Sequence, residues 1–414
     1  MQDLVIRGAR PWGGETTDIA VRNGRIAAIG SDLPAAPGDE MIDARGCLAI
    51  PGLVDAHAHI DKTLWGTPWH PHQAGPSLME KINNERQVLA GLGLSPEVQS
   101  ARLLRRLIAC GTTHVRTHVD VGPDVGLAHL HGVQAMREKH RDWIDIDIVA
   151  FPQTGVMIRP GTLDLLEQAA RDGAEVIGGL DPVGVDRDPK GQLDGLFAIA
   201  GKHGCGIDIH LHDRGDLGAV TMEMIAERTR SLGLAGKVAI SHAFCLGGVE
   251  PARLESLIAL LLENDIAIMT HAPAGATPFP PIRLLHERGV RLFSGSDGIR
   301  DTWSPLNNGD MLERAFLLAY RSGFRDDTGI EIALRMATYG GAQVMGVANY
   351  GLTVGSAADL VLVEAETAAE AVAYHPVRRL VLKRGRVVAR DGRSLLPESE
   401  CFPSCFNAIA SSPS

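Results

Sequence analysis

Cysteine is scarce in this sequence, and its distribution suggests neither a disulfide framework nor a thiolate metal site. The 414 residues include six cysteines, with no CxxC pair among them, and only Cys401 and Cys405 lie close together. In a chain of this length, scattered cysteines are typical of a protein whose thiols stay reduced. We therefore expect a cytoplasmic protein.

Long apolar runs and blocks of like charge are also missing. Apolar runs such as Leu257–Leu262 are far shorter than the roughly 20 residues that span a bilayer. The start of the chain, Met1–Arg7, shows no charged segment followed by an apolar one, so we expect no secretory signal. The net charge of −10 is spread without long runs. This pattern argues against nucleic acid or a membrane as the main partner.

Short apolar runs alternate with helical patterns between about residues 50 and 300. The helical segments, such as Glu97–Cys110 and Pro251–Glu263, carry apolar residues three and four positions apart. Eight such alternations predict an α/β protein with a (β/α)8 TIM barrel. The expected barrel strands are Leu48–His57, Thr113–Asp120, Ile144–Gln153, Glu175–Leu180, Gly206–Asp213, Lys237–His242, Ile266–His271 and Val290–Asp297.

The two flanks of this region have a different texture. Residues 2–50 and 351–393 contain short β-like pieces separated by Gly, Asn and Asp turns. Neither flank has enough strands to stand alone, so we expect both to pair into one small β-sandwich. The expected units are a small domain of residues 1–50 plus 350–395, a catalytic barrel of residues 51–349, and a C-terminal tail of residues 396–414.

Each expected barrel strand has an apolar run and ends in, or is directly followed by, a group that can bind a metal, a proton or a ligand, such as Asp181 after the fourth strand. The C-terminal strand ends of such a barrel converge on one mouth, where catalytic residues lie. Residues i and i+2 of a strand point to the same side, so His57 and His59 would aim two imidazoles at one point. A single histidine at a strand end is more often structural, but agreement among eight strands favours a functional site.

The composition of this mouth predicts the type of metal. Imidazoles with one carboxylate suit Zn2+ or Fe2+, whereas Ca2+ and Mg2+ prefer oxygen ligands. A bridging second metal would need a ligand such as a carboxylated lysine near the end of the fourth strand, and Lys190 comes only later, in a polar loop. We therefore expect one divalent ion with an open position for water. Its expected ligands are His57, His59, His210 and Asp297.

Seven stretches of the sequence carry motifs around the strand ends. They are "PGLVDAHAHIDKT" (51–63), "THVRTHVDV" (113–121), "IVAFPQTG" (148–155), "IDIHLHD" (207–213), "SHAF" (241–244), "GSDGIRDTWSPLNNGDML" (295–312) and "GSAADLVLVEA" (355–365). With these stretches the chain resembles the amidohydrolase superfamily, and within it the bacterial cytosine deaminase group. The HxH of the first stretch is common in the superfamily, whereas its combination with "HVRTHVDV" and "FPQ" is more specific.

This resemblance implies that a metal-bound hydroxide removes ammonia or a small amine from a heterocyclic ring carbon. Asp297 would remain a metal ligand while accepting the proton of the nucleophile. His242 matches the catalytic histidine beside that hydroxide. Gln153 matches an amide that hydrogen-bonds the polar edge of the ring, and Trp303 matches an aromatic residue that lines the pocket.

Two positions depart from the cytosine deaminase pattern. The proton shuttle three residues after the strand-five histidine is normally glutamate, and here it is the shorter Asp213. His212 precedes it and could share or replace the role. Gly298 stands where cytosine deaminases carry a second aspartate directly after the metal ligand. This glycine opens volume and favours a ring larger than cytosine or differently substituted.

Other polar residues near the strand ends are expected to support the site. We expect Asp61, His118 and His271 to orient the imidazoles of the metal ligands. Arg116 and Asp120 are expected to form a buried ion pair under the site.

A second HxH, made by His70 and His72, lies in a proline-rich stretch. Pro68, Pro71 and Pro76 exclude a central strand there, so we expect a loop over the barrel mouth.

The leading hypothesis is a metal-dependent aminohydrolase that deaminates a cytosine-like, pterin-like or triazine-like heterocycle. The alternative is hydrolysis of a cyclic amide, a urea or an N-alkylamine on such a ring. The intact ligand set argues against a non-catalytic, metabolite-binding barrel. We expect a small heterocyclic substrate as partner, and a homo-oligomer.

Overall fold

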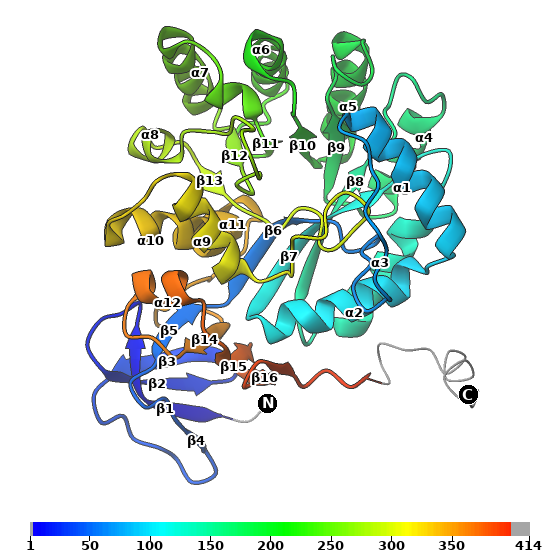
Figure 1. Cartoon of the computed structure of the whole chain (residues 1–414). Helices are drawn as coiled ribbons and strands as arrows, with labels where there is room; N and C mark the ends of the chain where they lie inside the picture. The colour runs from blue at the N-terminus through cyan, green and yellow to red at the C-terminus, as the bar shows by residue number, and fades with distance from the viewer. Residues whose placement is uncertain (1–2, 399–414) are drawn as a thin grey trace, which may run out of the picture.

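The computed structural model describes residues 3–398, which form a barrel and a separate sheet beside it (Figure 1). Eight parallel strands form the barrel sheet, and each pairs with its neighbour in chain order. Together with the separate sheet from the two flanks, this confirms the predicted fold class. The barrel strands are β6 (Leu53–Ala58), β7 (Thr112–Asp120), β8 (Asp145–Phe151), β9 (Val176–Leu180), β10 (Gly206–His210), β11 (Val238–Ser241), β12 (Ala267–Met269) and β13 (Leu292–Phe293).

The barrel closes through the residues that follow β13. The backbone N–H of Asp297 donates to the carbonyl of His57 at 2.7 Å, and that of Ala56 donates to Ser294 at 3.2 Å. A side chain at Gly295 would place its Cβ 2.3 Å from the carbonyl oxygen of His57, so glycine allows this close approach. The closure holds Asp297 next to the histidines of β6.

Helices surround the barrel, and most of them bury an apolar face against neighbouring strands and helices. In α2, Ser95 caps the first turn, Pro96 occupies its first position, and Leu103, Leu104 and Leu107 are buried. The helices are α1 (Leu78–Leu92), α2 (Pro96–Ala109), α3 (Ala128–His140), α4 (Thr162–Arg171), α5 (Pro189–His203), α6 (Gly215–Ser231), α7 (Pro251–Glu263), α8 (Ile282–Glu287), α9 (Met311–Arg321), α10 (Asp327–Arg335), α11 (Gly341–Val344) and α12 (Ala368–Tyr374), with a 3-10 turn at Phe244–Gly247 and a π-helical turn at Met336–Gly340.

The small domain has its own hydrophobic core, built by both flanks of the chain. Its strands hydrogen-bond into one continuous, mainly antiparallel sheet, in which β5 pairs with β14. The strands are β1 (Leu4–Pro11), β2 (Thr17–Arg22), β3 (Arg25–Gly30), β4 (Glu40–Asp43), β5 (Leu48–Pro51), β14 (Leu360–Val363), β15 (Arg378–Lys383), β16 (Arg386–Arg390) and β17 (Arg393–Ser394).

The predicted first barrel strand, Leu48–His57, is wrong in one respect, because it is two strands. The N–H of Gly52 donates to Asp359 of the small domain, whereas the N–H of Leu53 donates to Gly111 at the base of the barrel. The chain therefore leaves the small sheet and enters the barrel at Gly52. An unbroken apolar run conceals this change of partner.

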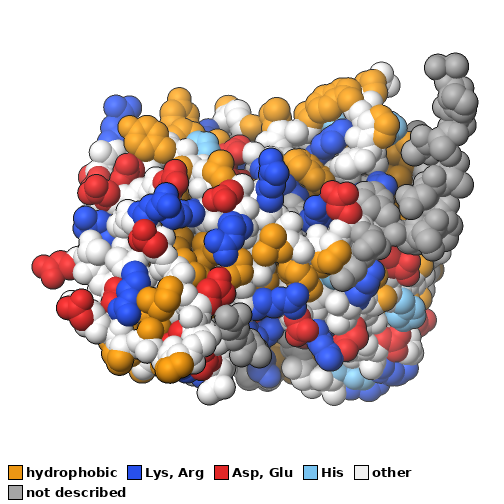
Figure 2. All heavy atoms as spheres, turned by 90° about the horizontal axis from the view of Figure 1, so that it is seen from below, with side chains coloured by type: hydrophobic (Ala, Val, Ile, Leu, Met, Phe, Trp, Pro, Cys, Tyr) orange, Lys and Arg blue, Asp and Glu red, His pale blue; other side chains and the backbone are white. Residues whose placement is uncertain are grey.

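Three further predictions concern the surface charge, membrane-spanning helices and the C-terminal tail. On the face that Figure 2 shows, basic and acidic side chains are interspersed. None of the helices within residues 3–398 is long and apolar enough to cross a membrane. Most of the predicted tail, from residue 399 onward, lies outside the described residues.

Candidate active site

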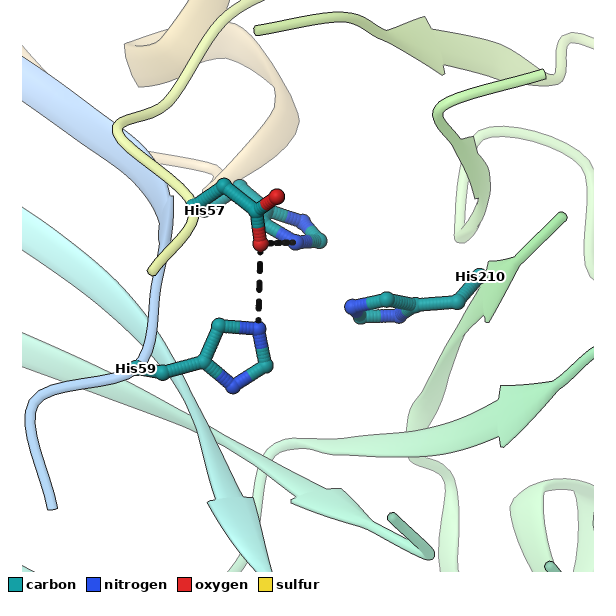
Figure 3. A group of neighbouring side chains, drawn as sticks. His57, His59 and His210 are labelled. Carbon is teal, nitrogen blue, oxygen red and sulfur yellow. Dashed lines mark ion pairs between the residues drawn. The ribbon is translucent and has the colours of Figure 1, made fainter. Parts of the chain in front are cut away.

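Three imidazoles and one carboxylate meet at the mouth of the barrel. His57 lies in β6, His59 follows that strand directly, and His210 ends β10. Asp297 Oδ1 lies 3.3 Å from Nε2 of His59 and 3.7 Å from Nε2 of His57. The three rings point toward one another (Figure 3), and one donor atom of each of the four side chains lies within 4.8 Å of the others. The structure thus brings together all four predicted ligands.

The electrostatics of this cluster favour neutral imidazoles and an ionised carboxylate. Burial lowers the pKa of His57 to about 3, and the nearby His118 acts in the same direction. Burial and adjacent imidazoles also hold the pKa of His210 well below its usual value. Burial by itself would raise the pKa of Asp297, but its histidine neighbours, led by His271, hold it well below the usual range. These are the protonation states that bind a divalent metal.

Several buried ring nitrogens here have no hydrogen-bond partner among the described residues. They are Nε2 of His57, Nε2 of His242 and both ring nitrogens of His210. An unpaired buried polar atom costs about 1–3 kcal/mol, so their convergence points to a bound group. Imidazoles with one carboxylate fit a transition metal better than Ca2+ or Mg2+. The residues present therefore fit one divalent ion.

A polar chain behind the cluster fixes the ring of His57. Ser241 Oγ, at the end of β11, donates to Oδ1 of Asp208 at 2.6 Å and lies 3.0 Å from Nδ1 of His57. A hydroxyl has one proton, so it must accept from Nδ1–H of the imidazole, and this leaves Nε2 free for a metal. The sequence analysis missed Ser241 and Asp208, although Asp208 shares a strand face with His210.

His118, one of the residues expected to orient the ligands, packs against them. Its ring centroid lies 4.0 Å from that of His57, and its Nε2 lies 3.4 Å from Oδ2 of Asp208. It therefore supports the cluster mainly through ring packing.

His242 is held by two other imidazoles. Its Nδ1 lies 3.2 Å from Nδ1 of His271, and its ring stacks on His212 with centroids 4.3 Å apart. Nδ1 of His212 lies 2.7 Å from Oδ2 of Asp181, which keeps the proton on that nitrogen. Burial lowers the pKa of His212, but the charge and hydrogen bond of Asp181 outweigh it and raise the pKa. His271 thus contacts His242, and its Nε2 also lies 3.8 Å from Oδ2 of Asp297.

Asp213 bonds to the loop after β9. Its Oδ2 accepts the backbone N–H of Gly184 at 3.1 Å, and no hydrogen bond among the described residues joins it to the ligand cluster. Burial raises the pKa of Asp213 to about 6, and the charge of Asp181 acts in the same direction. Its role as the proton shuttle stays a prediction.

A buried ion cluster contains Lys62, which the sequence analysis did not single out. Its Nζ donates to Oε1 of Gln153 at 2.6 Å, to Oδ1 of Asp120 at 2.9 Å and to Oε1 of Glu85 at 3.2 Å. An ammonium only donates, so Gln153 presents its oxygen to Lys62 and its NH2 group elsewhere. Phe151 links this cluster to the ligands, because its ring lies 4.2 Å from that of His210 and 5.9 Å from the ammonium.

A cavity of about 650 Å³ opens between α1 and the C-terminal ends of β7 and β8. Lys62 and Gln153 line its polar side, and Leu89 and Val121 contribute apolar surface. A mostly apolar cavity with a few convergent polar groups is typical of a small-molecule site. Gln153 therefore faces a space large enough for a small heterocycle.

The loop after β13 brings Trp303 to the same region. Trp303 packs with Ile82 of α1 and with Phe151, and its Nε1 is buried with no hydrogen-bond partner in residues 3–398. His72 Nε2 lies 2.6 Å from the carbonyl oxygen of Asp301, so the proline-rich segment is tied to this loop. No strand forms at the second HxH, as its prolines predict.

The predicted ion pair between Arg116 and Asp120 is wrong. Arg116 Nε donates to Oδ2 of Asp147 at 2.6 Å, whereas Asp120 pairs with Lys62. Four residues of a strand span about 13 Å, so the two side chains point the same way but cannot meet.

The predicted role of Asp61 is also wrong. Its Oδ2 lies 2.7 Å from Nδ1 of His129 and accepts the N–H of Asp120 at 3.2 Å. Nδ1 of His59 has no partner among the described residues. Asp61 therefore fixes the loop beside the cavity instead of orienting a metal ligand.

The barrel and the donor set at its mouth define the class of a metal-dependent (β/α)8 hydrolase. A sequence model of the amidohydrolase family matches residues 40–389, and the chain belongs to that family. It is therefore a metal-dependent enzyme that hydrolyses carbon–nitrogen bonds other than peptide bonds.

Three known proteins are similar over nearly the whole chain. The N-isopropylammelide isopropyl amidohydrolase of Pseudomonas sp. (strain ADP) is 31% identical over 399 residues, which cover 94% of this chain and 98% of the relative. The crystal structure of N-isopropylammelide isopropylaminohydrolase from Burkholderia multivorans ATCC 17616 has 46% identity and a TM-score of 0.92, with 95% and 100% coverage. The structure of 5-methylcytosine deaminase from Klebsiella pneumoniae liganded with 5-fluorocytosine has 26% identity and a TM-score of 0.84, with 94% and 97% coverage. The predicted resemblance is confirmed.

Proposed function

We propose that this enzyme hydrolyses the bond between a ring carbon and an amino or alkylamino nitrogen of an oxo-substituted nitrogen heterocycle. Two of the similar proteins are named for removing isopropylamine from N-isopropylammelide, and a third is a 5-methylcytosine deaminase. This reaction includes both the deaminase hypothesis and its N-alkylamine alternative, because each releases a small amine from a ring carbon. The observation that carries the proposal is the donor cluster beside both the His212–His242 stack and the hydrogen-bonded Gln153.

We propose Zn2+ or Fe2+ as the metal, held by the four predicted ligands. When bound, such an ion supplies the Lewis acidity that allows water to attack near neutral pH. Asp297 has the most exposed side chain of the four, 29% against at most 6% for His57 and His59. Its carboxylate can therefore accept a proton on the open side of the site.

We propose His212 as the group that carries a proton to the departing amine. Asp181 holds its Nδ1 and favours the protonated ring, while Nε2 carries no hydrogen bond to any described residue. The stack on His242 keeps the ring beside the ligand cluster. Asp213 is the second candidate, because a pKa of about 6 suits proton transfer near neutrality.

We propose that Gln153 recognises an oxygen of the substrate ring. Lys62 fixes the amide so that its NH2 group is the available donor, and burial of both residues keeps water from competing for this bond. A ring with an oxo group would meet this donor in the cavity.

Amine release tests the proposed reaction. The enzyme loaded with Zn2+ or Fe2+ would be incubated with aminopyrimidines, oxo-aminotriazines, their N-alkyl derivatives and pterins. The expected result is stoichiometric ammonia or alkylamine from at least one oxo-substituted ring. If no ring releases an amine but a cyclic amide or urea opens, the alternative amidohydrolase reaction replaces this one.

We also propose a cytoplasmic location, a homo-oligomer, and the division into residues 1–50 plus 350–395 and residues 51–349. Cys47, Cys110, Cys205 and Cys245 are buried free thiols, which supports a reducing compartment. Light scattering after gel filtration should give a multiple of the chain mass, and a monomer would contradict the assembly.

A further inference from the structure

We infer that Asp301 supplies the substrate-facing carboxylate that this chain lacks at position 298. The role rests on the proposed function, because it concerns recognition of the same ring. Gly298 follows the metal ligand Asp297 and contributes no side chain. The space next to it nevertheless contains a carboxylate, from a residue three positions further along the loop.

The geometry makes positions 298 and 301 mutually exclusive. A Cβ at Gly298 would lie 1.8 Å from Oδ2 of Asp301 and 2.7 Å from its Cγ. Even an alanine at 298 would therefore displace the Asp301 carboxylate. Glycine at 298 is what allows Asp301 to occupy this place.

The loop holds Asp301 with one carboxylate oxygen engaged and the other unengaged. Oδ1 accepts the backbone N–H groups of Trp303 at 2.8 Å and Ser304 at 2.9 Å. The residue is only 4% exposed, and Oδ2 has no hydrogen-bond partner among residues 3–398. A carboxylate oxygen that no described residue pairs with is available to accept a hydrogen bond from a ligand.

The neighbours of Asp301 place it within the candidate active site. Its charge interacts with those of Lys62 and Asp297, and it also acts on Glu85. Lys62 in turn holds Gln153. Asp301 therefore lies near Asp297 and near Lys62, and Lys62 lines the cavity.

The chemistry of these two groups selects a type of ring edge. A carboxylate oxygen only accepts, so Oδ2 requires an N–H on the substrate, whereas the NH2 group of Gln153 requires a carbonyl oxygen. The ligand that meets both demands is a heterocycle in its lactam form, with ring N–H and C=O groups. An oxo-triazine or an oxo-pyrimidine has this edge.

Exchange of the acceptor for a donor tests this role without disturbing the loop. Asp301→Asn keeps Oδ1 for the two backbone N–H groups and turns Oδ2 into an NH2 group. We expect kcat/KM for the lactam substrate to fall by about 10²-fold or more. The preference for that substrate over its N-methyl analogue should shrink by the same factor, whereas metal content and Tm should stay as in the wild type.

Steric exclusion adds a double-mutant test. Gly298→Ala should lower kcat/KM because its methyl group displaces the carboxylate, but it should cause no further loss in an Asp301→Ala background. Gly298→Asp combined with Asp301→Gly should recover at least about tenfold over Asp301→Ala, because the carboxylate returns from the neighbouring position. If the two single losses multiply, or if Asp301→Asn retains the wild-type selectivity, the role is overturned.

Binding separates a failure of this role from a failure of the proposed reaction. If the wild type releases no amine from any ring, the reaction is wrong. Calorimetry with the imides barbituric acid and cyanuric acid would then test Asp301 directly on the metal-loaded enzyme. Binding that weakens at least about tenfold in Asp301→Asn supports the role, and equal binding contradicts it.

Discussion

Two clusters of histidine and aspartate lie at opposite ends of the barrel, and they differ in what fills their centre. At the mouth, donor atoms of His57, His59, His210 and Asp297 converge, and several ring nitrogens there have no hydrogen-bond partner within residues 3–398. At the other end, His114, Asp145 and Asp359 also bring donor atoms together. There, Nζ of Lys383 lies 2.7 Å from Asp359 Oδ2, 2.8 Å from Asp145 Oδ2 and 3.3 Å from His114 Nε2.

The difference shows that a set of metal-binding residue types does not by itself make a metal site. The cluster of His114, Asp145 and Asp359, here called the lower cluster, already contains the ammonium group of Lys383. It joins β7 and β8 of the barrel to the small sheet. The mouth has no such internal cation among its four ligand side chains. We therefore interpret the lower cluster as a structural ion network and the mouth as the catalytic metal centre.

Loss of a mouth ligand should have the largest effect on activity. Asp297→Asn removes the anionic ligand, so we expect metal loss and a decrease in kcat on the order of 10⁴-fold or more. The stability of the metal-free protein should change little, because no ion is then held. Elemental analysis and amine release measure these effects, and retention of a tenth of the activity would contradict the assignment.

Loss of the Lys383 ammonium group from the lower cluster should instead lower the free energy of unfolding. Lys383→Met removes the cation beside the buried carboxylate of Asp359, whereas Asp145 keeps its ion pair with Arg384. We therefore expect the free energy of unfolding to fall by about 3–5 kcal/mol. Metal content per folded chain should not change. Lys190→Met is the matched control, since this exposed lysine pairs with Asp194 on the same helix and its loss should lower the stability far less. Urea unfolding measures both variants, and equal losses of stability would contradict a structural role of Lys383.

Two variants at the mouth distinguish the candidate proton donors. His212→Gln should lower kcat by about 10²–10⁴-fold, because it removes the proposed proton donor, whereas Asp213→Asn should cost less than about tenfold. Steady-state kinetics at saturating metal measure both. The reverse order would make Asp213 the proton shuttle.

The smallest effect is expected behind the cluster. Ser241→Ala breaks the chain from Asp208 to His57, so metal affinity should weaken by about 10–100-fold. Ser231→Ala, which removes an exposed hydroxyl on α6, should leave the affinity unchanged. Competition with a chelator measures both constants, and equal affinities would show that Ser241 does not orient the ligand.

Much of the fold and the ligand set followed from local patterns. Alternating strands and helices predicted the barrel, and the shared polarity of the strand ends led to His57, His59, His210 and Asp297. The periodicity of a strand predicts the face on which a side chain lies, but it does not predict which residue of another strand that side chain contacts. The expected Arg116–Asp120 pair failed for this reason.

The roles of other residues could not be predicted from the sequence, because they depend on contacts between residues far apart in the chain. Lys62 and Glu85 meet across 23 residues, and Ser241 meets His57 across 184. The carboxylate of Asp301 takes the place of a side chain at Gly298 only because a tight turn folds the loop back. A hydrophobicity pattern cannot predict that one residue's side chain occupies the space beside another residue.

Anomalous X-ray diffraction from crystals of the metal-loaded enzyme, measured at the zinc and iron absorption edges, shows directly whether the metal binds at the mouth. We expect one strong peak among His57, His59, His210 and Asp297, and no peak beside Lys383. A peak at the lower cluster, or no peak at the mouth in active enzyme, would contradict this expectation.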